Sequence, residues 1–424
     1  MKKKLLQSEF LKNVITLMSG TAIAQAIPVL ISPILSRLYT PEDFGVLALF
    51  MSIAAVISVI ATGRYELAIM LPEKKRDAYN VLALSLLFTF IVSVFTFILV
   101  VIFKKPVAIF FEEPGIEPWL YFLPIVVLFA GMYQAFNYWS TRHKTFKRNA
   151  AGRVSQSTVM SATNLGMGVA KAGSSGLILG YILGQVVAAL VLGWQTLIHL
   201  KEIRKEITRK EIIENAKKYK NFLKINTPHA FLDSLQNNGI IYLIMFFFSK
   251  LILGSYSFAF RILKAPVGLI GNAIYQVFYQ KATEALKEGR EIQTLVRRIY
   301  RNLFLIGFPV FFLLFLFARP VFTFVFGEEW KISGEIAQIL IPWLFLNFIA
   351  SPVSCIAIIM NKQREAMFIT FADITFKVIA IVIGGISNDF KLAFIIMSVL
   401  CSSLLIFALF WYYKIAKTES AKTY

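Results

Sequence analysis

The chain has 424 residues, of which 57% are hydrophobic, 40 are Phe and only 16% are charged, and its mean hydropathy is +0.68. A soluble core cannot bury so much apolar surface, so this composition excludes an ordinary soluble domain. Stretches of 20 or more largely apolar residues recur along the whole chain, and about 20 residues span a hydrocarbon core of roughly 30 Å. A barrel would need alternating strands of about ten residues. The sequence therefore predicts an all-α polytopic membrane protein.

The N-terminal stretch has a basic start and the triplet Ala22-Ile23-Ala24, which a cleaved signal peptide would also have. The apolar run continues to Leu38, too long for a signal sequence, so we expect an uncleaved first span. Twelve transmembrane helices are predicted, with boundaries accurate to about three residues. They are residues 13–38, 44–70, 78–103, 118–141, 149–170, 174–199, 222–249, 251–281, 299–325, 334–361, 365–386 and 391–413.

The basic residues predict the topology of these spans. If the N-terminus is cytoplasmic, 31 of the 44 Lys and Arg residues fall in cytoplasmic segments, eight fall in outer segments and five lie inside spans. The positive-inside rule then places both termini in the cytoplasm. The net charge of +20 is accounted for by loops at an anionic leaflet, so a nucleic-acid partner is not expected.

The longest polar stretch, KEIRKEITRKEIIENAKKYKNFLK, runs from Lys201 to Lys224 and has isoleucines spaced among basic residues. This pattern predicts a cytoplasmic amphipathic helix that lies on the membrane. It divides the chain into an N-terminal six-helix lobe, residues 1–200, a linker helix, residues 201–221, and a C-terminal six-helix lobe, residues 222–424.

The two halves resemble each other weakly. Aligning the stretches after the first and seventh spans places Gly45 opposite Gly254. FFEEPGIEPWLYFLP before the fourth span likewise corresponds to VFGEEWKISGEIAQILIP before the tenth, and the loops STRHKTFKRN and MNKQREAM follow at matching places. Because both halves begin on the cytoplasmic side, we expect a parallel repeat whose pseudo-twofold axis follows the membrane normal, with a central cavity between two lobes.

Three stretches of the sequence resemble the polysaccharide biosynthesis transporters, the O-antigen and capsule repeat-unit flippases of the Wzx type. They are GRYELAIMLPEKK, YWSTRHKTFKRNA and FGEEWKISGEIAQILIPW. That family belongs with lipid II flippases and multidrug extruders in the multidrug/oligosaccharidyl-lipid/polysaccharide exporter superfamily. The resemblance covers nearly the whole chain. It implies an alternating-access carrier that moves an undecaprenyl-pyrophosphate-linked oligosaccharide from the cytoplasmic to the outer leaflet. The chain lacks room for the two extra C-terminal spans of lipid II flippases, which favours the repeat-unit branch.

The resemblance also implies the setting of the protein. We expect a multi-pass protein of the cytoplasmic membrane of a bacterium, monomeric, with lipid-linked oligosaccharide and membrane lipids as its partners. A polysaccharide polymerase and the chain-length machinery are further expected partners. No cofactor is expected apart from Na⁺ or H⁺ as a coupling ion, as in relatives that have cation sites in the C-terminal lobe.

Span eight carries one polar stripe that falls within about 60° of a single direction on the helix. The stripe consists of Arg261, Lys264, Gly268, Asn272, Tyr275, Gln276 and Tyr279. Arg261 would lie roughly 15 Å deep, near the membrane midplane. Arg and Lys there suit a pyrophosphate, which Arg grips with a fork of donors and Lys attracts as a point charge. The alternative is a buried pair of Arg261 with a carboxylate such as Asp233.

Two further spans are polar on one face. Span five is rich in Gly, and the residues Arg153, Gln156, Ser157, Asn164 and Lys171 share a face that fits a cavity wall better than lipid. Span one has a milder stripe with Gln25 and two prolines, Pro28 and Pro33, which predict either a broken helix or a simple kink. The residues predicted to bind substrate are Arg261, Lys264, Arg153, Arg64, Asn272, Gln276 and Gln25.

Two carboxylates are candidates for ion coupling. Asp233 in span seven and Asp373 in span eleven lie at a similar predicted depth of roughly 12–14 Å from the cytoplasmic side. With oxygens from Asn237 and Ser398, they could bind Na⁺ or share a proton. The alternative is that Lys377, four residues after Asp373, simply neutralises it.

Arg64 stands at the end of span two. If the span is one helix running inward from Phe44, Arg64 lies about 30 Å along it, at the inner membrane boundary. Arg64 and Glu66 would then differ by about 200° around the helix and would not pair. The two interpretations are interfacial snorkelling on a helical extension ended by Pro72, and a cytoplasmic entrance where Arg64 meets the pyrophosphate.

Catalytic signatures do not occur in the sequence. It contains neither GxxxxGK[ST] nor HExxH, and His143, His199 and His229 are scattered. Cys355 and Cys401 lie in apolar runs and are expected to be packing residues. The outer segments are short, which disfavours an enzyme. The alternative function is a cation-coupled drug extruder of the same superfamily, whose cavity should be acidic or aromatic. A scaffolding protein is disfavoured by the buried charged stripes.

Overall fold

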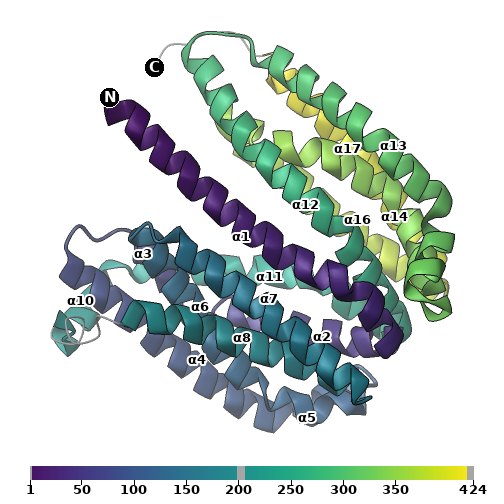
Figure 1. Ribbon diagram of the computed structural model, residues 1–424, viewed down its shortest axis with the longest axis horizontal. Coiled ribbons are helices and arrows are strands. Elements are labelled where there is room, and N and C mark those ends of the chain that lie inside the picture. Colours follow the sequence, from purple (N-terminus) through teal and green to yellow (C-terminus); the bar gives the residue numbers. More distant parts are fainter. Residues whose placement is uncertain (1, 198–205, 418–424) are drawn as a thin grey trace. The chain divides into compact units, whose positions relative to one another are not determined.

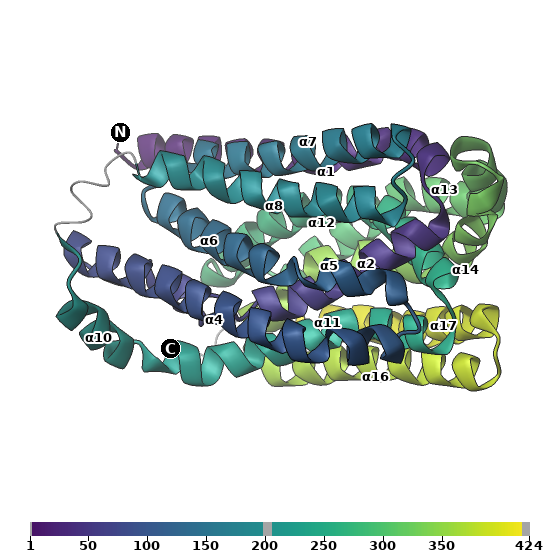
Figure 2. The ribbon, with the colours of Figure 1, turned by 90° about the horizontal axis from the view of Figure 1, so that it is seen from below.

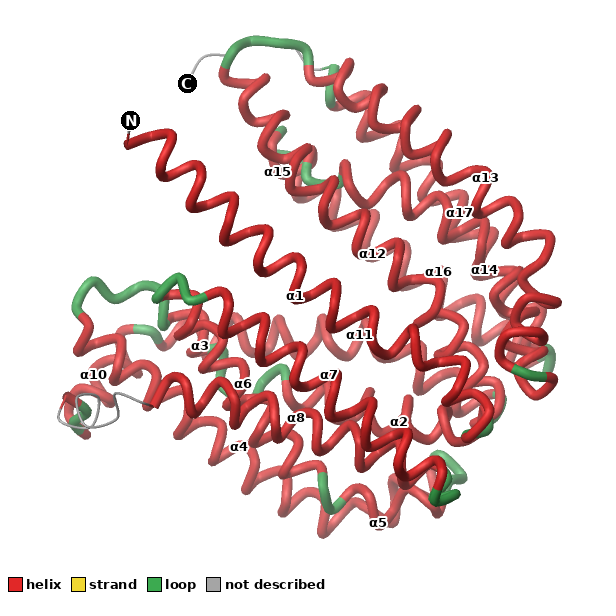
Figure 3. Tube along the Cα trace, viewed as in Figure 1, coloured by secondary structure: helices red, strands yellow, loops and turns green. Residues whose placement is uncertain are grey.

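The computed structural model describes residues 2–197 and 206–417, and every regular element in these ranges is a helix (Figure 3). Twelve of the described helices are long, and each corresponds to one predicted span. They are α1 (Lys2–Leu38), α2 (Pro41–Ser58), α4 (Lys75–Phe110), α6 (Leu123–Arg142), α7 (Phe146–Val169), α8 (Ser174–Leu197), α11 (Thr227–Phe247), α12 (Lys250–Lys287), α13 (Ile292–Phe326), α14 (Lys331–Ala350), α16 (Gln363–Ile386) and α17 (Phe390–Ile415) (Figure 1). The all-α, multi-span fold class is confirmed.

Hydropathy separates these helices into two groups. Within the described residues, eight segments are long and apolar enough to cross a membrane, and a ninth is the pair formed by Pro114–Leu120 and α6, bent by 52°. The long helices that do not meet this criterion are α7, α11 and α12. These are three of the spans in which the sequence places polar stripes. Each therefore needs a protein or water-filled environment along its polar face.

The chain forms two compact units, Met1–Tyr242 and Leu243–Tyr424, and the division falls inside α11. In the first unit α7 packs between α1 and α8, while α6 packs against α4 and α8. In the second unit α13 packs on α14, α16 packs on α17, and α14 also contacts α12 and α17. α1 is a continuous helix through Pro28 and Pro33, so of the two alternatives for span one the broken helix does not occur.

The internal repeat is visible in local backbone structure. A 3₁₀ turn precedes the fourth helix of each half, Pro114–Ile116 in the first and Glu328–Trp330 in the second. A residue with positive φ follows the third, fourth and fifth helices of each half. These residues are Glu112, Lys144 and Lys171 in the first half and Gly327, Asn361 and Asn388 in the second. The sequence alignment of Gly45 with Gly254 also holds, because each is the fifth residue of its helix.

The turn between α1 and α2 follows from the sequence TPED. The Thr40 hydroxyl accepts a hydrogen bond from the Asp43 backbone N–H at 3.3 Å, and the Asp43 carboxylate accepts one from the Thr40 N–H at 3.0 Å. This is a capping box, and Pro41 occupies the first helical position, where its missing N–H costs nothing. Ser249 caps α12 in the equivalent place by accepting from the Ile252 N–H.

Span two is not a continuous helix, contrary to the prediction for residues 44–70. α2 ends at Ser58, a turn follows, and a single helical turn, α3 (Tyr65–Ala68), comes before α4. Gly63 and Arg64 adopt left-handed φ values of 58° and 59°. A Cβ at Gly63 would approach the Phe88 ring to 2.9 Å, so only glycine fits there. The apolar composition of the segment conceals this break.

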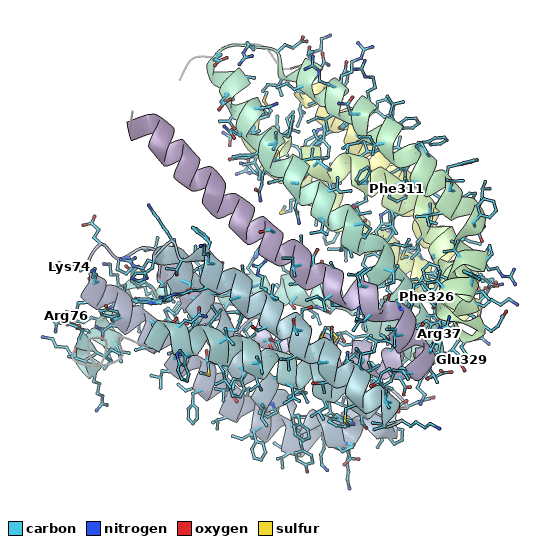
Figure 4. All side chains as sticks on the ribbon, viewed as in Figure 1. Arg37, Lys74, Arg76, Phe311, Phe326 and Glu329 are labelled. Atoms are coloured by element: carbon cyan, nitrogen blue, oxygen red, sulfur yellow. The ribbon has the colours of Figure 1, made fainter. Side chains whose placement is uncertain are left out.

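The cytoplasmic linker was predicted to be a helix lying on the membrane. Residues 198–205 lie outside the described residues, and the described part contains one helix, α10 (Arg209–Lys218). α10 packs against the start of α4 (Figure 2), and Arg76, labelled near α10 in Figure 4, forms an ion pair of 2.7 Å with Glu211. The linker helix is therefore bonded to the first unit.

Asn80 of α4 holds this contact. Its side chain is fully buried, its Nδ2 donates to the Glu206 carbonyl at 2.9 Å and to the Glu211 carboxylate at 2.7 Å, and its Oδ1 accepts from the Thr208 N–H at 3.1 Å. One amide thus satisfies a backbone carbonyl and a backbone N–H of the linker. Such buried groups are costly when they lose their partners.

Replacing Asn80 with alanine is expected to release α10 from α4. The substitution leaves the part-buried Thr208 N–H and Glu206 carbonyl without their Asn80 partner, and it removes the bond to the Glu211 carboxylate. Amides of α10 should then exchange hydrogen at least about fivefold faster, as measured by hydrogen exchange with mass spectrometry. Lys75→Ala, on an exposed side chain at the start of the same helix, should leave the exchange of α10 unchanged. Equal protection of α10 in Asn80→Ala and the wild type would show that Asn80 does not hold the linker.

Candidate functional site

Four aromatic rings form a continuous stack in the second unit. Tyr256 and Phe260 lie one turn apart on α12, with ring centroids 5.6 Å apart and nearly parallel planes. Phe260 stacks on Trp343 of α14 at 5.9 Å, and Tyr256 stacks on Phe394 of α17 at 5.3 Å. The stack joins three helices and is mostly buried, since Tyr256, Trp343 and Phe394 are at most 6% exposed, so it forms a rigid apolar core in this region.

Two lysines flank this stack. The Lys264 Nζ lies 4.9 Å from the centroid of the Phe260 ring, and the Lys377 Nζ lies 4.9 Å from that of Trp343. Since Phe260 and Trp343 stack on each other, the two ammonium groups approach neighbouring rings. Both are at cation–π distance. Lys264 also interacts electrostatically with Lys377 and with Asp373, so α12 and α16 contribute to one charged cluster.

Asp373 is the anion of this cluster. Its carboxylate pairs with Lys377 on the next turn of α16, and the two side chains are 29% and 24% exposed. The Cys401 thiol of α17 also contacts Asp373. We name Lys264, Lys377 and Asp373 the lysine cluster. It has two cations and one anion, and the exposed side chain of Lys264 makes it a suitable place for an anionic ligand.

The other predicted residues of the second unit lie on α12 and α17. Asn272 and Gln276 are exposed on α12 beyond Lys264, and Arg261, one turn before Lys264, is partly buried. Ser398 is buried and lines a pocket between α13, α14 and α17 whose lining does not include Asp373. Cys355 and Cys401 are both buried free thiols.

The predicted residues of α11 form local contacts of their own. Asp233 is 55% exposed and pairs with His229 one turn earlier at 3.1 Å. The Asn237 amide donates to the Asp233 backbone carbonyl at 2.8 Å. Asp233 belongs to the first unit and Asp373 to the second. Each candidate coupling carboxylate therefore already has a basic partner within its own helix.

The polar face of α7 packs against α1. The Arg153 guanidinium donates to the Thr21 hydroxyl at 2.8 Å and also contacts the Tyr133 hydroxyl. Ser157 donates to the Ala24 carbonyl at 2.6 Å. Lys171, predicted to share this face, instead lies in the turn after α7 with a φ of 56°. Gln25 is exposed on α1.

The prediction that Arg64 and Glu66 cannot pair is wrong. The Arg64 Nη1 lies 3.2 Å from the Glu66 Oε1, and the Thr62 hydroxyl donates to the same carboxylate. The 200° separation applies only within a regular helix, and Arg64 has left-handed backbone angles just before α3 begins. Glu66 is 1% exposed and Arg64 is 25% exposed. The Nε of Arg64 is buried without a hydrogen-bond partner among the described residues.

Sequence reasoning did not identify three members of the site. The sequence indicates Lys377 only as a neutraliser of Asp373, because its contact with Trp343 joins different helices and cannot be read from spacing along one helix. Phe260 had an available signal, since it precedes Lys264 by one helical turn on α12. Trp343 had no comparable signal, because nothing in its local sequence indicates which helix it faces.

Comparisons with solved structures show which known fold the chain shares. The lipid II flippase MurJ in an inward closed conformation is similar, with a TM-score of 0.75 and 13% identity. The match covers 95% of this chain and 90% of the MurJ chain. An inward-facing multidrug resistance MATE family transporter of the MOP superfamily is similar with a TM-score of 0.67 and 16% identity, covering 95% and 96% of the two chains. A MOP superfamily transporter from Pyrococcus furiosus has a TM-score of 0.61 and 16% identity, covering 95% and 94%. The fold is therefore that of the MOP superfamily transporters.

The sequence model of the family described as "Polysaccharide biosynthesis protein" matches residues 34–335. This match covers well over half of the chain, so the chain belongs to the polysaccharide biosynthesis protein family. The resemblance found in the sequence is thereby confirmed. No curated protein sequence matches the chain.

Proposed function

We propose that the chain is a flippase that moves an undecaprenyl-pyrophosphate-linked oligosaccharide repeat unit across the bacterial cytoplasmic membrane by alternating access. The product would serve the synthesis of O-antigen, capsule or exopolysaccharide, and both termini would be cytoplasmic. Membership of the polysaccharide biosynthesis family supports this proposal. The observation that carries it is the lysine cluster on the Phe260–Trp343 stack.

The chemistry of the lysine cluster suits such a substrate. The substrate has an anionic pyrophosphate next to a sugar chain, so its recognition needs cations beside rigid surfaces. Lys264 and Lys377 supply the cations, and the stacked rings that they contact are mostly buried and hold the two ammonium groups in place. A charge inside a membrane protein is expensive unless it meets a partner or a water-filled cavity. An exposed Lys264 is therefore better explained by an anionic ligand than by a structural role.

The other predicted substrate residues differ in whether they could contact the substrate in their present positions. Arg261 lies one turn before Lys264 on α12, where its guanidinium fork would grip the same pyrophosphate. Asn272 and Gln276, exposed farther along α12, would meet sugar hydroxyls, as would Gln25 on α1. Arg153 and Arg64 would have to exchange their present partners, Thr21 and Glu66, for the substrate.

A cellular experiment separates this proposal from the drug extruder. Cells that lack the protein should accumulate lipid-linked repeat units and lose surface polysaccharide, while their sensitivity to cationic drugs should not change. A net positive lysine cluster would repel a cationic drug, which is the physical reason for this expectation. Normal surface polysaccharide together with increased drug sensitivity would contradict the flippase and favour the extruder.

A coupling ion forms a second part of the proposal. Na⁺ or H⁺ entering at Asp233 or Asp373 would displace the basic partner, His229 or Lys377, and so change which groups carry charge. We expect Asp233→Asn and Asp373→Asn each to lose the dependence of transport on an ion gradient in liposomes. Asp77→Asn, on the cytoplasmic end of α4, is the matched control. If transport by both variants stays gradient-dependent, coupling through these carboxylates is wrong.

A further inference from the structure

A groove runs along the second unit between α13, α14 and α17. One part of it is a pocket of about 420 Å³ with a mostly apolar lining of Phe315, Ile339, Pro342, Ile395, Ser398, Val399, Ser402 and Ser403. An adjoining pocket of about 340 Å³ is lined by Phe315, Arg319, Glu335, Gln338, Ile339 and Lys391. The two pockets share Phe315 and Ile339, so they form one groove, which we name the α13–α17 groove. On α13 it lies between Phe311 and Phe326, both labelled in Figure 4.

The length of the groove matches one leaflet of a membrane. Its residues on α17 recur every three or four positions from Lys391 to Ser403, which places them along one face of the helix. Twelve steps of 1.5 Å give a length of about 18 Å. Half of a hydrocarbon core of roughly 30 Å is about 15 Å. An acyl chain of one leaflet would therefore fill the groove.

All ionised side chains of the groove lie at one end. The Glu335 carboxylate lies 3.3 Å from the Arg319 Nε and 3.0 Å from the Lys391 Nζ. Glu335 is 17% exposed, whereas Arg319 and Lys391 remain 48% and 53% exposed. Arg has five N–H donors and Lys has three, so one carboxylate does not use them all. This end carries a net positive charge and retains donors for an anion.

The remainder of the groove is suited to a hydrocarbon chain. Its lining is aliphatic and aromatic apart from three serines, and the Ser403 hydroxyl donates to the Val399 carbonyl of its own helix at 2.9 Å. Ser403 therefore presents little polarity to a neighbour, and the Ser402 hydroxyl is the polar atom of this part that is buried without a hydrogen-bond partner among the described residues. A charged end followed by an apolar channel is complementary to an amphipathic anion with a long chain.

We propose that the α13–α17 groove binds one anionic glycerophospholipid, with its phosphate between Arg319 and Lys391 and an acyl chain along the apolar part. The topology of the proposed function places the charged end at the outer surface, so the lipid would come from the outer leaflet. The site is distinct from the substrate site, because no residue of the lysine cluster lines the groove. The lipid would fill the space between α13, α14 and α17.

Native mass spectrometry of the purified full chain with phosphatidylglycerol or phosphatidylcholine tests the charged end. Arg319→Ala/Lys391→Ala should weaken phosphatidylglycerol binding by about 10- to 30-fold, given the known contribution of basic residues near anionic lipid. Binding of phosphatidylcholine should change little. Lys105→Ala/Lys171→Ala removes the same charge from exposed positions of the first unit, which contributes no residue to the groove lining, and should bind phosphatidylglycerol as the wild type does.

A second pair of variants tests the apolar part without altering charge. Val399→Trp should fill the groove and reduce phosphatidylglycerol retention. Val310→Trp is the control and should not reduce retention, because Val310 does not line the groove. The two valines are equally exposed, at 57% and 56%. Wild-type retention in both Arg319→Ala/Lys391→Ala and Val399→Trp would overturn the proposal. Equal loss in Lys105→Ala/Lys171→Ala would also overturn it, since binding would then reflect overall charge. Displacement of the lipid by inorganic phosphate would indicate a free anion site and contradict a lipid site.

Discussion

Lys264→Ala/Lys377→Ala is expected to lower the export of lipid-linked oligosaccharide at least about 100-fold. Each lysine would make charge-assisted contacts with the pyrophosphate, and such contacts contribute about 1.5–3 kcal/mol each. Removing both therefore costs about 3–6 kcal/mol, and every 1.4 kcal/mol is a factor of ten. The variant also leaves Asp373 without its partner, so the cluster changes from net positive to net negative and repels the substrate.

Export is measured as surface polysaccharide in cells that contain only the variant, with protein levels in the membrane fraction checked alongside. Lys281→Ala is the matched control, because Lys281 is an exposed lysine on the same helix, near its C-terminal end. Lys377→Arg keeps the charge and should keep part of the activity. Export at the wild-type rate by Lys264→Ala/Lys377→Ala would remove the lysine cluster from the substrate site.

Glu66→Ala is expected to destabilise the protein more than any other single substitution considered for the first unit. Glu66 is almost fully buried and holds both the Arg64 guanidinium and the Thr62 hydroxyl. Breaking a buried pair costs about 3–5 kcal/mol. Because Arg64 is 25% exposed, part of this cost is recovered by water, and we expect a loss of about 2–3 kcal/mol.

This loss should lower the apparent melting temperature of the purified protein by about 4–12 °C, since units of this size shift by about 2–4 °C per kcal/mol. Glu66→Gln preserves a hydrogen-bond acceptor for Thr62 and should lose less. Glu73→Ala alters an exposed carboxylate in the turn before α4 and should melt like the wild type. An unchanged melting temperature for Glu66→Ala would mean that the Arg64–Glu66 pair does not stabilise this turn.

The number and order of the helices could be predicted because the membrane imposes a strong constraint. Every backbone polar group in hydrocarbon needs an internal partner, so each apolar run long enough to cross must be helical. The polar helices α7, α11 and α12 were also found, because their stripes interrupt otherwise apolar segments. The repeat could be seen in short motifs, since turns such as Thr40-Pro41 depend on local chemistry.

The break after Ser58 could not be read from hydropathy, because apolar residues on both sides of it give a continuous run. The one local signal was Gly63, whose left-handed backbone only glycine adopts readily. Once the helix breaks, angles calculated at 100° per residue no longer apply. The error about Arg64 and Glu66 follows directly from that. Angles between side chains can therefore be calculated from residue spacing only where the helix is continuous.

Only part of the candidate site could be predicted from the sequence. Residues that share one helix, such as Arg261 and Lys264, were predicted to lie together because the helix period fixes their relative positions. Contacts between helices were not predictable, because helix packing depends on the whole set of side chains at each interface. Lys377 and Trp343 come together only through the packing of α14, α16 and α17.

Reconstitution of the purified chain in liposomes tests the central claim most directly. A lipid-linked oligosaccharide with a pyrophosphate bridge is placed in the membrane, and its appearance at the opposite leaflet is followed with a lectin or glycosidase that cannot cross. We predict that the wild-type protein moves the substrate and that Lys264→Ala/Lys377→Ala does not. Movement of a cationic drug instead, with the lipid-linked oligosaccharide remaining in its original leaflet, would contradict the assignment as a flippase.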